Sequence, residues 1–211
     1  MKEQKQSFDQ VLERRGSNSL KWDNLADPQM IPMWVADMDF QVMPEIQEAL
    51  HKRAEHGIFG YAGPDDSYRQ AVCGWMQRRH QLEISPESIL CSNGVVSALK
   101  TAIQAFSSPG DAVAVITPVY YPFYRAIESN GRKIHPLSLT LKEEGYVLED
   151  SELEKLDGAT LLLFCNPHNP VGKVWTEQEQ QKIGAACLRY GVKVVSDEIH
   201  GDFIRPGIRM V

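Results

Sequence analysis

The chain has 211 residues, with 22 Lys and Arg against 28 Asp and Glu, a formal net charge of −6, 43% hydrophobic residues and 24% charged residues. This is the composition of a globular protein that is long enough to bury a hydrophobic core. Because the chain is acidic and has no basic block, we expect it to bind neither nucleic acid nor an anionic membrane. No apolar run reaches the ~20 residues of a membrane helix, and no signal-type apolar segment follows Met1, so the sequence predicts a cytoplasmic protein.

The four cysteines are widely spaced and show no CxxC pairing. A disulfide framework or a metal site would need closer or regular spacing. Three of them lie within apolar stretches, where a reduced thiol packs as a small hydrophobic group. We therefore expect reduced, buried thiols and no metal site at Cys73, Cys91, Cys165 and Cys187.

The first third of the chain shows two helical patterns after a polar start. Residues 1–30 are polar and aperiodic, which is typical of an N-terminal arm, and residues 33–40 are apolar apart from two acids. Pro44 begins a helical pattern that stops at Gly57. A second helix is predicted to open at residues 64–66, where acidic residues suit the positive end of the helix dipole. Its apolar face consists of Tyr68, Val72, Trp75 and Met76.

From residue 88 onwards, apolar strands alternate with helices. We predict strands at 88–91, 111–116, 133–137, 159–164 and 192–197. We predict helices at 95–106, 123–129, 151–156 and 176–190. Thr176 and Glu179 form a capping box at the start of the last helix. Strands without polar alternation are covered on both faces, so the sequence predicts an α/β fold with a mainly parallel sheet and helices on both faces.

In an open α/β sheet, ligands bind beyond the carboxyl ends of the strands, and four segments there are unusual. Residues 91–97 read as a strand, a Gly turn and a helix start, whose free N–H groups could hold a phosphate or could simply make a turn. Residues 117–124 place aromatic side chains directly after a strand. They could pack in the core or offer a stacking surface to a flat ligand.

The other two segments carry an amide and an acid. Residues 165–172 contain two Asn-Pro steps, which favour a rigid loop that fixes an amide side chain. Residues 196–200 read Ser-Asp-Glu-Ile-His after an apolar strand. A buried acid is costly unless a cation pairs with it, so Asp197 indicates a bound positive group, with a solvated strand end as the alternative.

Pyridoxal 5'-phosphate fits this combination of groups. Its phosphate would lie at the helix that begins at Gly94, and Tyr120 would cover one face of its ring. Asn169 would donate to the ring oxygen. Asp197 would pair with the protonated ring nitrogen, which makes the ring an electron sink.

These four segments, together with residues 33–40 and 56–61, resemble the fold-type I pyridoxal-phosphate enzymes. More narrowly, they are similar to the cystathionine β-lyase and cysteine-S-conjugate β-lyase branch of the class I/II aminotransferase superfamily, which includes a maltose-regulon modulator. The resemblance runs from about residue 30 to about residue 203. It implies that residues 1–45 form an N-terminal arm and substrate-entrance segment, and that residues 46–211 are a partial cofactor-binding large domain.

The resemblance also assigns site residues. Gly94, Val95 and Val96 would bind the cofactor phosphate, and His200 would lie near the ring oxygen. Tyr61 would reach the phosphate of the neighbouring subunit, which implies a homodimer. The residues expected to line the substrate entrance are Trp34, Ala36 and Asp37.

The implied reaction is α,β-elimination of cystathionine or cysteine S-conjugates to pyruvate, ammonia and a thiol. Two alternatives remain open, an aminotransferase of the same fold and a non-catalytic regulatory or binding protein. In the family the Schiff-base lysine lies a few tens of residues beyond the Ser-Asp-Glu-Ile-His motif, and none of the 11 lysines stands in a matching context. The substrate-carboxylate arginine and the small C-terminal domain would also be absent. We therefore expect an N-terminal fragment, incomplete at its C-terminus and inactive by itself.

Overall fold

The computed structural model describes residues 8–208 and 210. The chain forms two compact units, which divide between Gly63 and Pro64. The boundary expected after residue 45, between the arm with the substrate-entrance segment and the partial large domain, differs from this division into compact units. That boundary stays a prediction.

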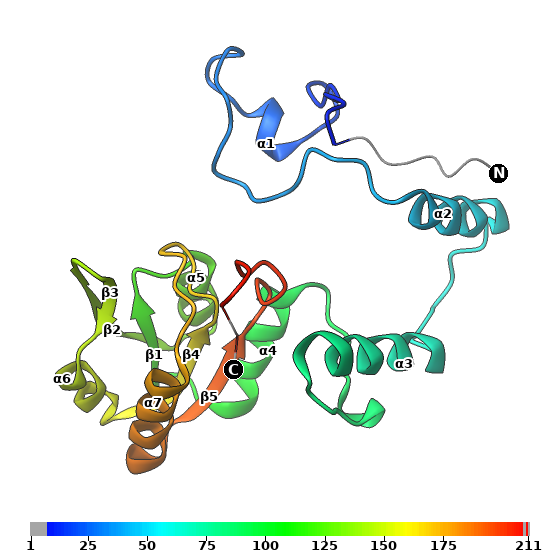
Figure 1. Ribbon diagram of the computed structural model, residues 1–211. Helices are drawn as coiled ribbons and strands as arrows, with labels where there is room; N and C mark the ends of the chain where they lie inside the picture. The colour runs from blue at the N-terminus through cyan, green and yellow to red at the C-terminus, as the bar shows by residue number, and fades with distance from the viewer. Residues whose placement is uncertain (1–7, 209, 211) are drawn as a thin grey trace. The chain divides into compact units, whose positions relative to one another are not determined.

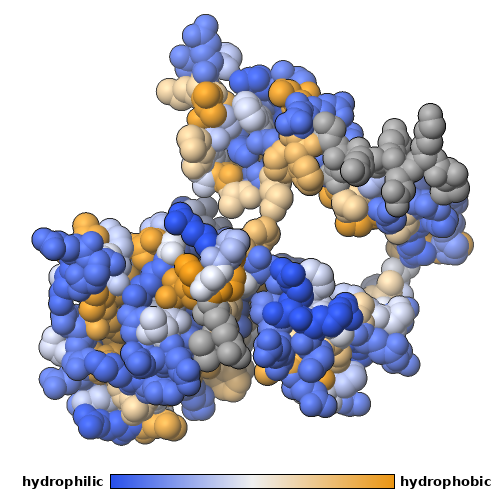
Figure 2. All heavy atoms as spheres, viewed as in Figure 1, coloured by the Kyte–Doolittle hydropathy of each residue, from blue (hydrophilic) through white to orange (hydrophobic). Residues whose placement is uncertain are grey.

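The N-terminal unit contains two helices, α1 (Leu20–Asp23) and α2 (Pro44–His56). The predicted limits of α2 are confirmed, because Gly57 adopts φ +69° and its N–H donates to the carbonyl of Ala54. None of the α2 residues is buried. Figure 2 shows orange apolar residues among the polar ones on the surface of this unit.

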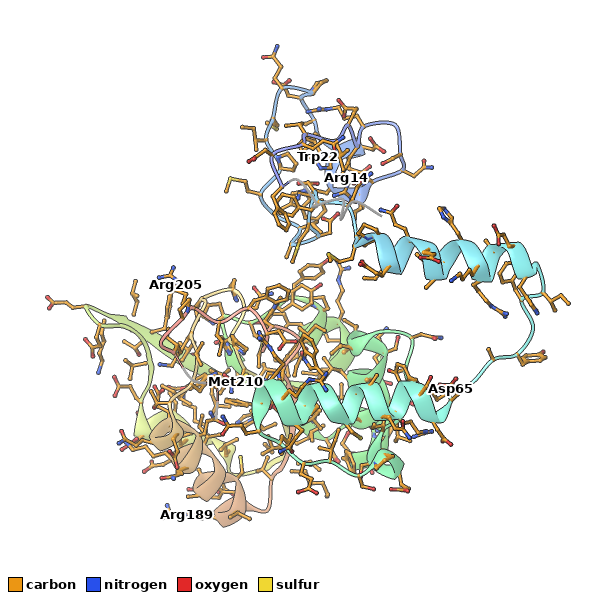
Figure 3. All side chains as sticks on the ribbon, turned by 45° about the vertical axis from the view of Figure 1, so that its right-hand side comes forward. Arg14, Trp22, Asp65, Arg189, Arg205 and Met210 are labelled. Carbon is orange, nitrogen blue, oxygen red and sulfur yellow. The ribbon has the colours of Figure 1, made fainter. Side chains whose placement is uncertain are left out.

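The C-terminal unit begins with α3 (Asp66–Trp75), which continues into a π-helix (Met76–His80). Asp65, at the start of α3 in Figure 3, accepts a hydrogen bond from the N–H of Tyr68 at 2.9 Å and caps the helix. The apolar face predicted for α3 is not buried, and the Trp75 side chain is 44% exposed. The indole Nε1 of Trp75 donates to Asp202 Oδ2 at 3.1 Å, so this helix is tied to the segment that follows the last strand.

The strand predicted at residues 88–91 is wrong. The chain forms a 3-10 helix at Pro86–Ser88 and then an extended segment that pairs with no strand of the sheet. Leu90 is 91% exposed. A run of three apolar residues is too short to separate a strand from an extended connection.

A five-stranded sheet forms the centre of the C-terminal unit. Its strands are β1 (Ala112–Thr117), β2 (Lys133–Lys142), β3 (Gly145–Leu148), β4 (Ala159–Cys165) and β5 (Lys193–Asp197). Their order is β3-β2-β1-β4-β5, and every pair is parallel except the β2–β3 hairpin. The mainly parallel sheet is confirmed, whereas β3 was not predicted.

Helices cover both faces of this sheet, as the sequence predicts (Figure 1). They are α4 (Val95–Phe106), α5 (Pro122–Glu128), α6 (Asp150–Leu153), a 3-10 turn (Glu154–Leu156) and α7 (Glu177–Tyr190). The predicted capping box is present in α7, where Glu179 N–H donates to Thr176 Oγ1 and the Glu179 carboxylate accepts from the N–H of Thr176. The short helix α6 has no side-chain cap.

The side chains of each central strand point alternately to the two faces of the sheet. Val113 and Val115 of β1 pack with α4 and α5, whereas Ala114 and Ile116 pack with α7 on the opposite face. Because side chains on a strand point alternately to the two faces, an all-apolar strand must be covered on both.

The chain order of the strands produces a switch point between β1 and β4. The β1-to-β2 connection runs through α5 on one face, and the β4-to-β5 connection runs through α7 on the other. The loops that follow β1 and β4 therefore diverge at neighbouring strand ends. This is the place where open α/β sheets bind ligands.

All four cysteines are free thiols. Cys165 and Cys187 are buried as expected, but the burial predicted for the other two is wrong, because Cys73 is only half-buried and Cys91 is exposed. Within residues 8–208 and 210, no three His, Cys, Asp or Glu side chains are placed to hold a metal ion. None of the helices described there is both long enough and apolar enough to cross a membrane.

Candidate functional site

Helix α4, which packs against β4 and β5, offers a helix N-terminus to the candidate site. Helix α4 begins directly after Gly94, which adopts φ +89° and ψ 159°, and among residues 8–208 and 210 no side chain caps it. The first helical N–H groups, including those of Val95 and Val96, are therefore free to bind an anion. A methyl group added to Gly94 would meet no heavy atom within 4 Å, so the space next to this turn is open.

The loop after β1 presents an aromatic side chain. Val119 is buried and anchors this loop, whereas the neighbouring Tyr120 is 38% exposed. The Tyr120 ring packs edge-on against Tyr121, with ring centroids 5.3 Å apart. The Tyr120 side chain is therefore only partly covered by the rest of the chain.

The loop after β4 is a narrow turn that carries Asn169. The N–H of His168 donates to the carbonyl of Lys173 at 2.6 Å, and the N–H of Gly172 donates back to the carbonyl of His168 at 2.8 Å. These two bonds close the turn and leave Asn169 partly exposed between them. The backbone of this loop is therefore held by its own hydrogen bonds, and the fixed position expected for the Asn169 amide stays a prediction.

Asn166, at the start of this loop, is fully buried. Its Oδ1 accepts from the N–H of Trp175 at 3.3 Å, and its own N–H donates to the carbonyl of Asp197 at 3.0 Å. The amide Nδ2 has no hydrogen-bond partner among the residues that the structure describes. Asn166 therefore links the start of this loop to Trp175 and to the end of β5.

Asp197 ends β5 with a nearly buried carboxylate that is 7% exposed. Its Oδ1 accepts a hydrogen bond from the N–H of Ile199 at 3.2 Å. Burial raises the pKa of Asp197, and the bond from Ile199 and the nearby His200 oppose this shift. Across residues 8–208 and 210, no lysine or arginine forms an ion pair with this carboxylate. The end of β5 therefore offers a desolvated negative group that lacks a cation.

The structure brings most of the predicted site residues to one edge of the sheet. Tyr120, Asn169 and Asp197 follow the neighbouring parallel strands β1, β4 and β5, and α4 packs against β4 and β5. His200 lies three residues beyond Asp197 and is partly buried. The other predicted site residues belong to the N-terminal unit, and their part in the site stays a prediction. They are Trp34, Ala36, Asp37 and Tyr61.

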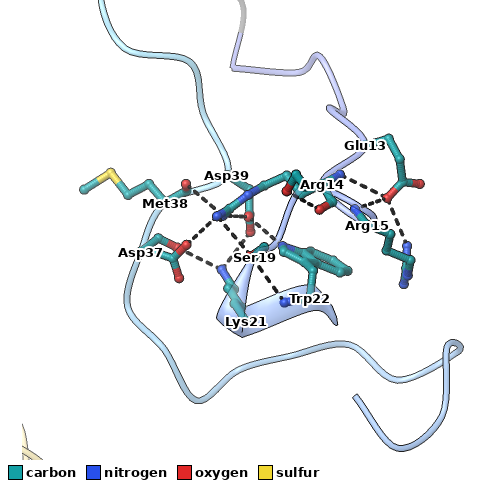
Figure 4. Close-up of polar contacts among 10 residues, drawn as sticks. Glu13, Arg14, Arg15, Ser19, Lys21, Trp22, Asp37, Met38 and Asp39 are labelled. Atoms are coloured by element: carbon teal, nitrogen blue, oxygen red, sulfur yellow. Dashed lines mark hydrogen bonds and ion pairs between the residues drawn. The ribbon is translucent and has the colours of Figure 1, made fainter. Parts of the chain in front are cut away.

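In the N-terminal unit, a network of charges holds the segment predicted to line the substrate entrance (Figure 4). Asp39 accepts from Arg14 at 2.5 Å, from Lys21 at 2.8 Å and from the indole of Trp22 at 2.8 Å. Arg14 also donates to Asp37 at 2.6 Å. Figure 3 shows Arg14 and Trp22 side by side in this unit. The N-terminal arm is thereby fastened to residues 37–39.

Sequence reasoning missed this network, because its partners lie 16 to 25 positions apart and no local pattern connects them. The sequence held one signal for these ion pairs. Two acids stand in an otherwise apolar run, and basic residues precede that run in a polar arm. Arg14, Lys21 and Trp22 are the residues that this signal could have suggested.

Comparisons with known proteins agree with this geometry. The profile of the family described as "Aminotransferase class I and II" matches residues 28–209. Cystathionine beta-lyase PatB of Bacillus subtilis (strain 168) is 49% identical over 208 residues, which are 95% of this chain and 54% of that protein. The chain thus spans about half the length of the curated relatives it matches.

Solved structures show the same fold. Cystalysin from Treponema denticola, a structure that contains pyridoxal 5'-phosphate, superposes with a TM-score of 0.90 and 40% identity over 98% of this chain and 55% of its own. The pyridoxal-phosphate-bound C–S lyase from Staphylococcus hominis gives a TM-score of 0.90 and 30% identity over 97% of this chain and 54% of its own. The expected large-domain fold is confirmed, and the chain belongs to the aminotransferase class I and II family.

Proposed function

We propose that this chain binds pyridoxal 5'-phosphate at the carboxyl edge of its sheet and is the N-terminal part of a carbon–sulfur β-lyase. The observation that carries the proposal is Asp197, a carboxylate that is 7% exposed at the end of β5 and that has no ion pair within the described part of the chain. A desolvated carboxylate is stabilised by a cation, and the protonated pyridine nitrogen of the cofactor is one.

The other groups at this edge match the remaining parts of the cofactor. The free N–H groups of Val95 and Val96 after Gly94 suit a phosphate, the amide of Asn169 suits the ring oxygen, and the ring of Tyr120 suits the pyridine face. His200 follows Asp197 and is assigned to the neighbourhood of the ring oxygen. When bound, the cofactor supplies an electron sink for negative charge at the substrate α-carbon.

Within this proposal, the protein's own residues bind and orient. Asp197 keeps the ring nitrogen protonated, because its buried carboxylate stabilises the cationic form. Asn169 would hold the ring oxygen by a hydrogen bond from its amide, and Tyr120 would pack against the ring face. Trp34, Ala36 and Asp37 would line the approach of the substrate, and the bonds from Arg14 to Asp37 and Asp39 hold the end of this segment.

The reaction proposed is α,β-elimination on cystathionine or a cysteine S-conjugate. The Cα–H and Cβ–S bonds break, the thiol leaves, and the remaining part takes up water to give pyruvate and ammonia. Support comes from the relatives at 49% and 33% identity, which are both named cystathionine beta-lyase. Two curated relatives named as aminotransferases are less similar, at 28% and 27% identity, although a solved structure named as a putative aminotransferase from Clostridium difficile 630 is 36% identical.

We also propose a homodimer in which Tyr61 reaches the phosphate held by the partner subunit. Its side chain is fully exposed in the single chain, which leaves it free to make such a contact. The 211-residue chain alone is proposed to be inactive, since it spans about half the length of its relatives and none of its 11 lysines matches the family position.

The first test is binding of pyridoxal 5'-phosphate to the 211-residue chain, followed by cofactor absorbance and by the midpoint of thermal unfolding. We expect the cofactor to stabilise the wild-type chain and not Asp197→Asn. Asp157→Asn, a change at an exposed acid that precedes β4, is the matched control and should respond as the wild type does. Equal stabilisation of all three chains would contradict the assignment of Asp197.

The second test addresses the reaction. The chain is fused to the part of PatB that lies beyond the matched segment, and the fusion is assayed for pyruvate released from cystathionine. We expect pyruvate from the fusion and none from the 211-residue chain. Keto-acid-dependent amino transfer without pyruvate release would favour the aminotransferase alternative, and cofactor binding without either activity would favour a regulatory protein.

A further inference from the structure

His168 connects the two loops that diverge at the switch point of the sheet. It lies in the loop after β4, is 1% exposed, and directly precedes Asn169. Its Nε2 lies 2.9 Å from the carbonyl oxygen of Pro118, 50 positions earlier in the loop after β1. Pro118 is separated from Tyr120 by one residue, so a single contact ties the segments that carry Tyr120 and Asn169.

The carbonyls around the ring favour a proton on Nε2. Nδ1 lies 3.3 Å from the carbonyl of Cys165, and this same carbonyl accepts the indole N–H of Trp175 at 2.9 Å. A neutral imidazole has one N–H to donate. With that proton on Nε2, the carbonyls of Pro118 and Cys165 are both satisfied.

The burial of the ring keeps it neutral. Burial lowers the pKa of His168, and the positive charge of Lys173 acts in the same direction, although the nearby backbone carbonyls oppose the shift. The imidazole and the indole of Trp175 are perpendicular to each other, with centroids 5.6 Å apart and an interplanar angle of 88°. Trp175 is itself fully buried, so the imidazole has one well-defined orientation.

We propose that His168 is a positioning residue, whose Nε2–H bond to the carbonyl of Pro118 holds the Tyr120 loop and the Asn169 loop in one fixed arrangement. At the switch point the connections leave towards opposite faces of the sheet, so the β-ladder does not fix these loops relative to each other. The importance of this for ligand binding rests on the proposed function, but the bridge itself does not require a cofactor.

The test compares His168→Phe with His168→Gln in the 211-residue chain without cofactor. Phenylalanine retains a ring against Trp175 but has no donor, so the carbonyl of Pro118 loses its partner. The amide nitrogen of glutamine can reach the position of Nε2 and donate again. We expect amide hydrogen exchange in residues 119–124 and 169–172 to become about tenfold faster in His168→Phe and to return towards wild type in His168→Gln.

Amides in the centres of β1 and β4 are the internal reference and should exchange at wild-type rates in both variants. Faster exchange in the loop after β4 alone, or in neither loop, would overturn the proposal, as would equal effects of Phe and Gln. If His168→Phe fails to fold, ¹⁵N NMR of the wild-type imidazole decides: a proton fixed on Nε2 supports the bridge, and one on Nδ1 overturns it.

Cofactor titration then separates this inference from the proposed function. We expect the affinity for pyridoxal 5'-phosphate to fall about tenfold in His168→Phe and to recover in His168→Gln. If the wild-type chain does not bind the cofactor but the exchange results are as expected, the bridge stands and the proposed function fails. If the cofactor binds equally well to all three chains, His168 does not position its ligands.

Discussion

Lys21 Nζ lies 2.8 Å from Asp39 Oδ2, although the two residues are 18 positions apart and the side chain of Lys21 is only 9% exposed. Lys21 also donates to the carbonyl of Asp37 at 2.9 Å. A buried ammonium needs such partners, because it cannot be left without hydrogen bonds at low cost. The position of residues 37–39 is therefore coupled to the burial of Lys21.

Asp39→Asn should loosen this network. Hydrogen bonds from Lys21, Trp22 and Arg14, in that order, hold the pKa of Asp39 well below its ordinary value of 3.8. A lowered pKa means that the carboxylate stabilises the folded unit above about pH 4 and that this stabilisation is lost as the pH falls through the folded-state pKa. We expect lower amide protection in residues 14–23 and 37–40 of Asp39→Asn at pH 7, and a smaller difference from wild type near pH 3.

Asp9→Asn, which changes an exposed acid in the same unit, is the control for the loss of one negative charge. It should leave the protection of both segments at the wild-type level. Equal loss in the two variants would mean that net charge, and not the bonds to Asp39, stabilises the unit.

Asp197→Asn should have the opposite effect on stability in the absence of cofactor. The pKa of Asp197 is raised, chiefly by burial. The charged carboxylate therefore lowers the free energy of unfolding, and this loss develops as the pH rises from the ordinary pKa through the folded-state pKa. We expect Asp197→Asn to be more stable than wild type at pH 7, by on the order of 1 kcal/mol, and the difference to vanish at low pH. Urea unfolding at pH 3.5 and pH 7 measures both values, and a destabilised variant at pH 7 would contradict the reading of an unpaired carboxylate.

The elements predicted correctly are those with local signals. Helix α7 has its capping box at Thr176 and Glu179, α2 has Pro44 at its start and Gly57 at its end, and β1 and β4 are continuous apolar runs. Each of these signals acts within a few residues, so a single sequence can reveal it. The candidate loops after β1 and β4 are located by the same signals, since they follow these strands directly.

What was missed depends on partners that are distant in the chain. The β3 strand exists only as the antiparallel partner of β2, and Arg14 and Lys21 acquire their roles from Asp37 and Asp39. His168 stands out only when the carbonyl of Pro118 is seen beside it. The strand predicted at 88–91 is wrong for the opposite reason. Its local apolar pattern is typical of a strand, but within the described residues no neighbouring strand pairs with it.

Gly94→Ala should weaken both the fold and anion binding. The φ of +89° and ψ of 159° at Gly94 lie in a region that is nearly restricted to glycine, which costs other residues about 1–3 kcal/mol. Crowding is not the reason, because an added methyl group would meet nothing within 4 Å. We expect a destabilised chain with lower affinity for inorganic phosphate, measured by urea unfolding and by calorimetric titration.

Gly184→Ala is the matched control in the interior of α7. Its added methyl group also meets nothing within 4 Å, and its backbone is helical. Alanine should therefore stabilise this position by about 0.5–1 kcal/mol. If both variants change stability in the same direction, the backbone conformation of Gly94 is not what requires glycine there.

The free edge of the sheet should govern aggregation of the 211-residue chain. β5 ends the strand order and pairs only with β4 in the part of the chain that the structure describes, and Val194 in its centre is 46% exposed. An edge strand with unpaired backbone groups and an apolar side chain is a template for pairing with another chain. Val194→Lys adds a charge at this edge, and the stem of lysine can still cover the same apolar surface.

Leu188→Lys on α7 is the control, because Leu188 is 85% exposed and the substitution changes the net charge by the same one unit, from −6 to −5. We expect light scattering during concentration to fall severalfold in Val194→Lys and to change little in Leu188→Lys. Equal improvement in both would assign the aggregation to exposed apolar surface in general, and no improvement in either would remove β5 as its cause.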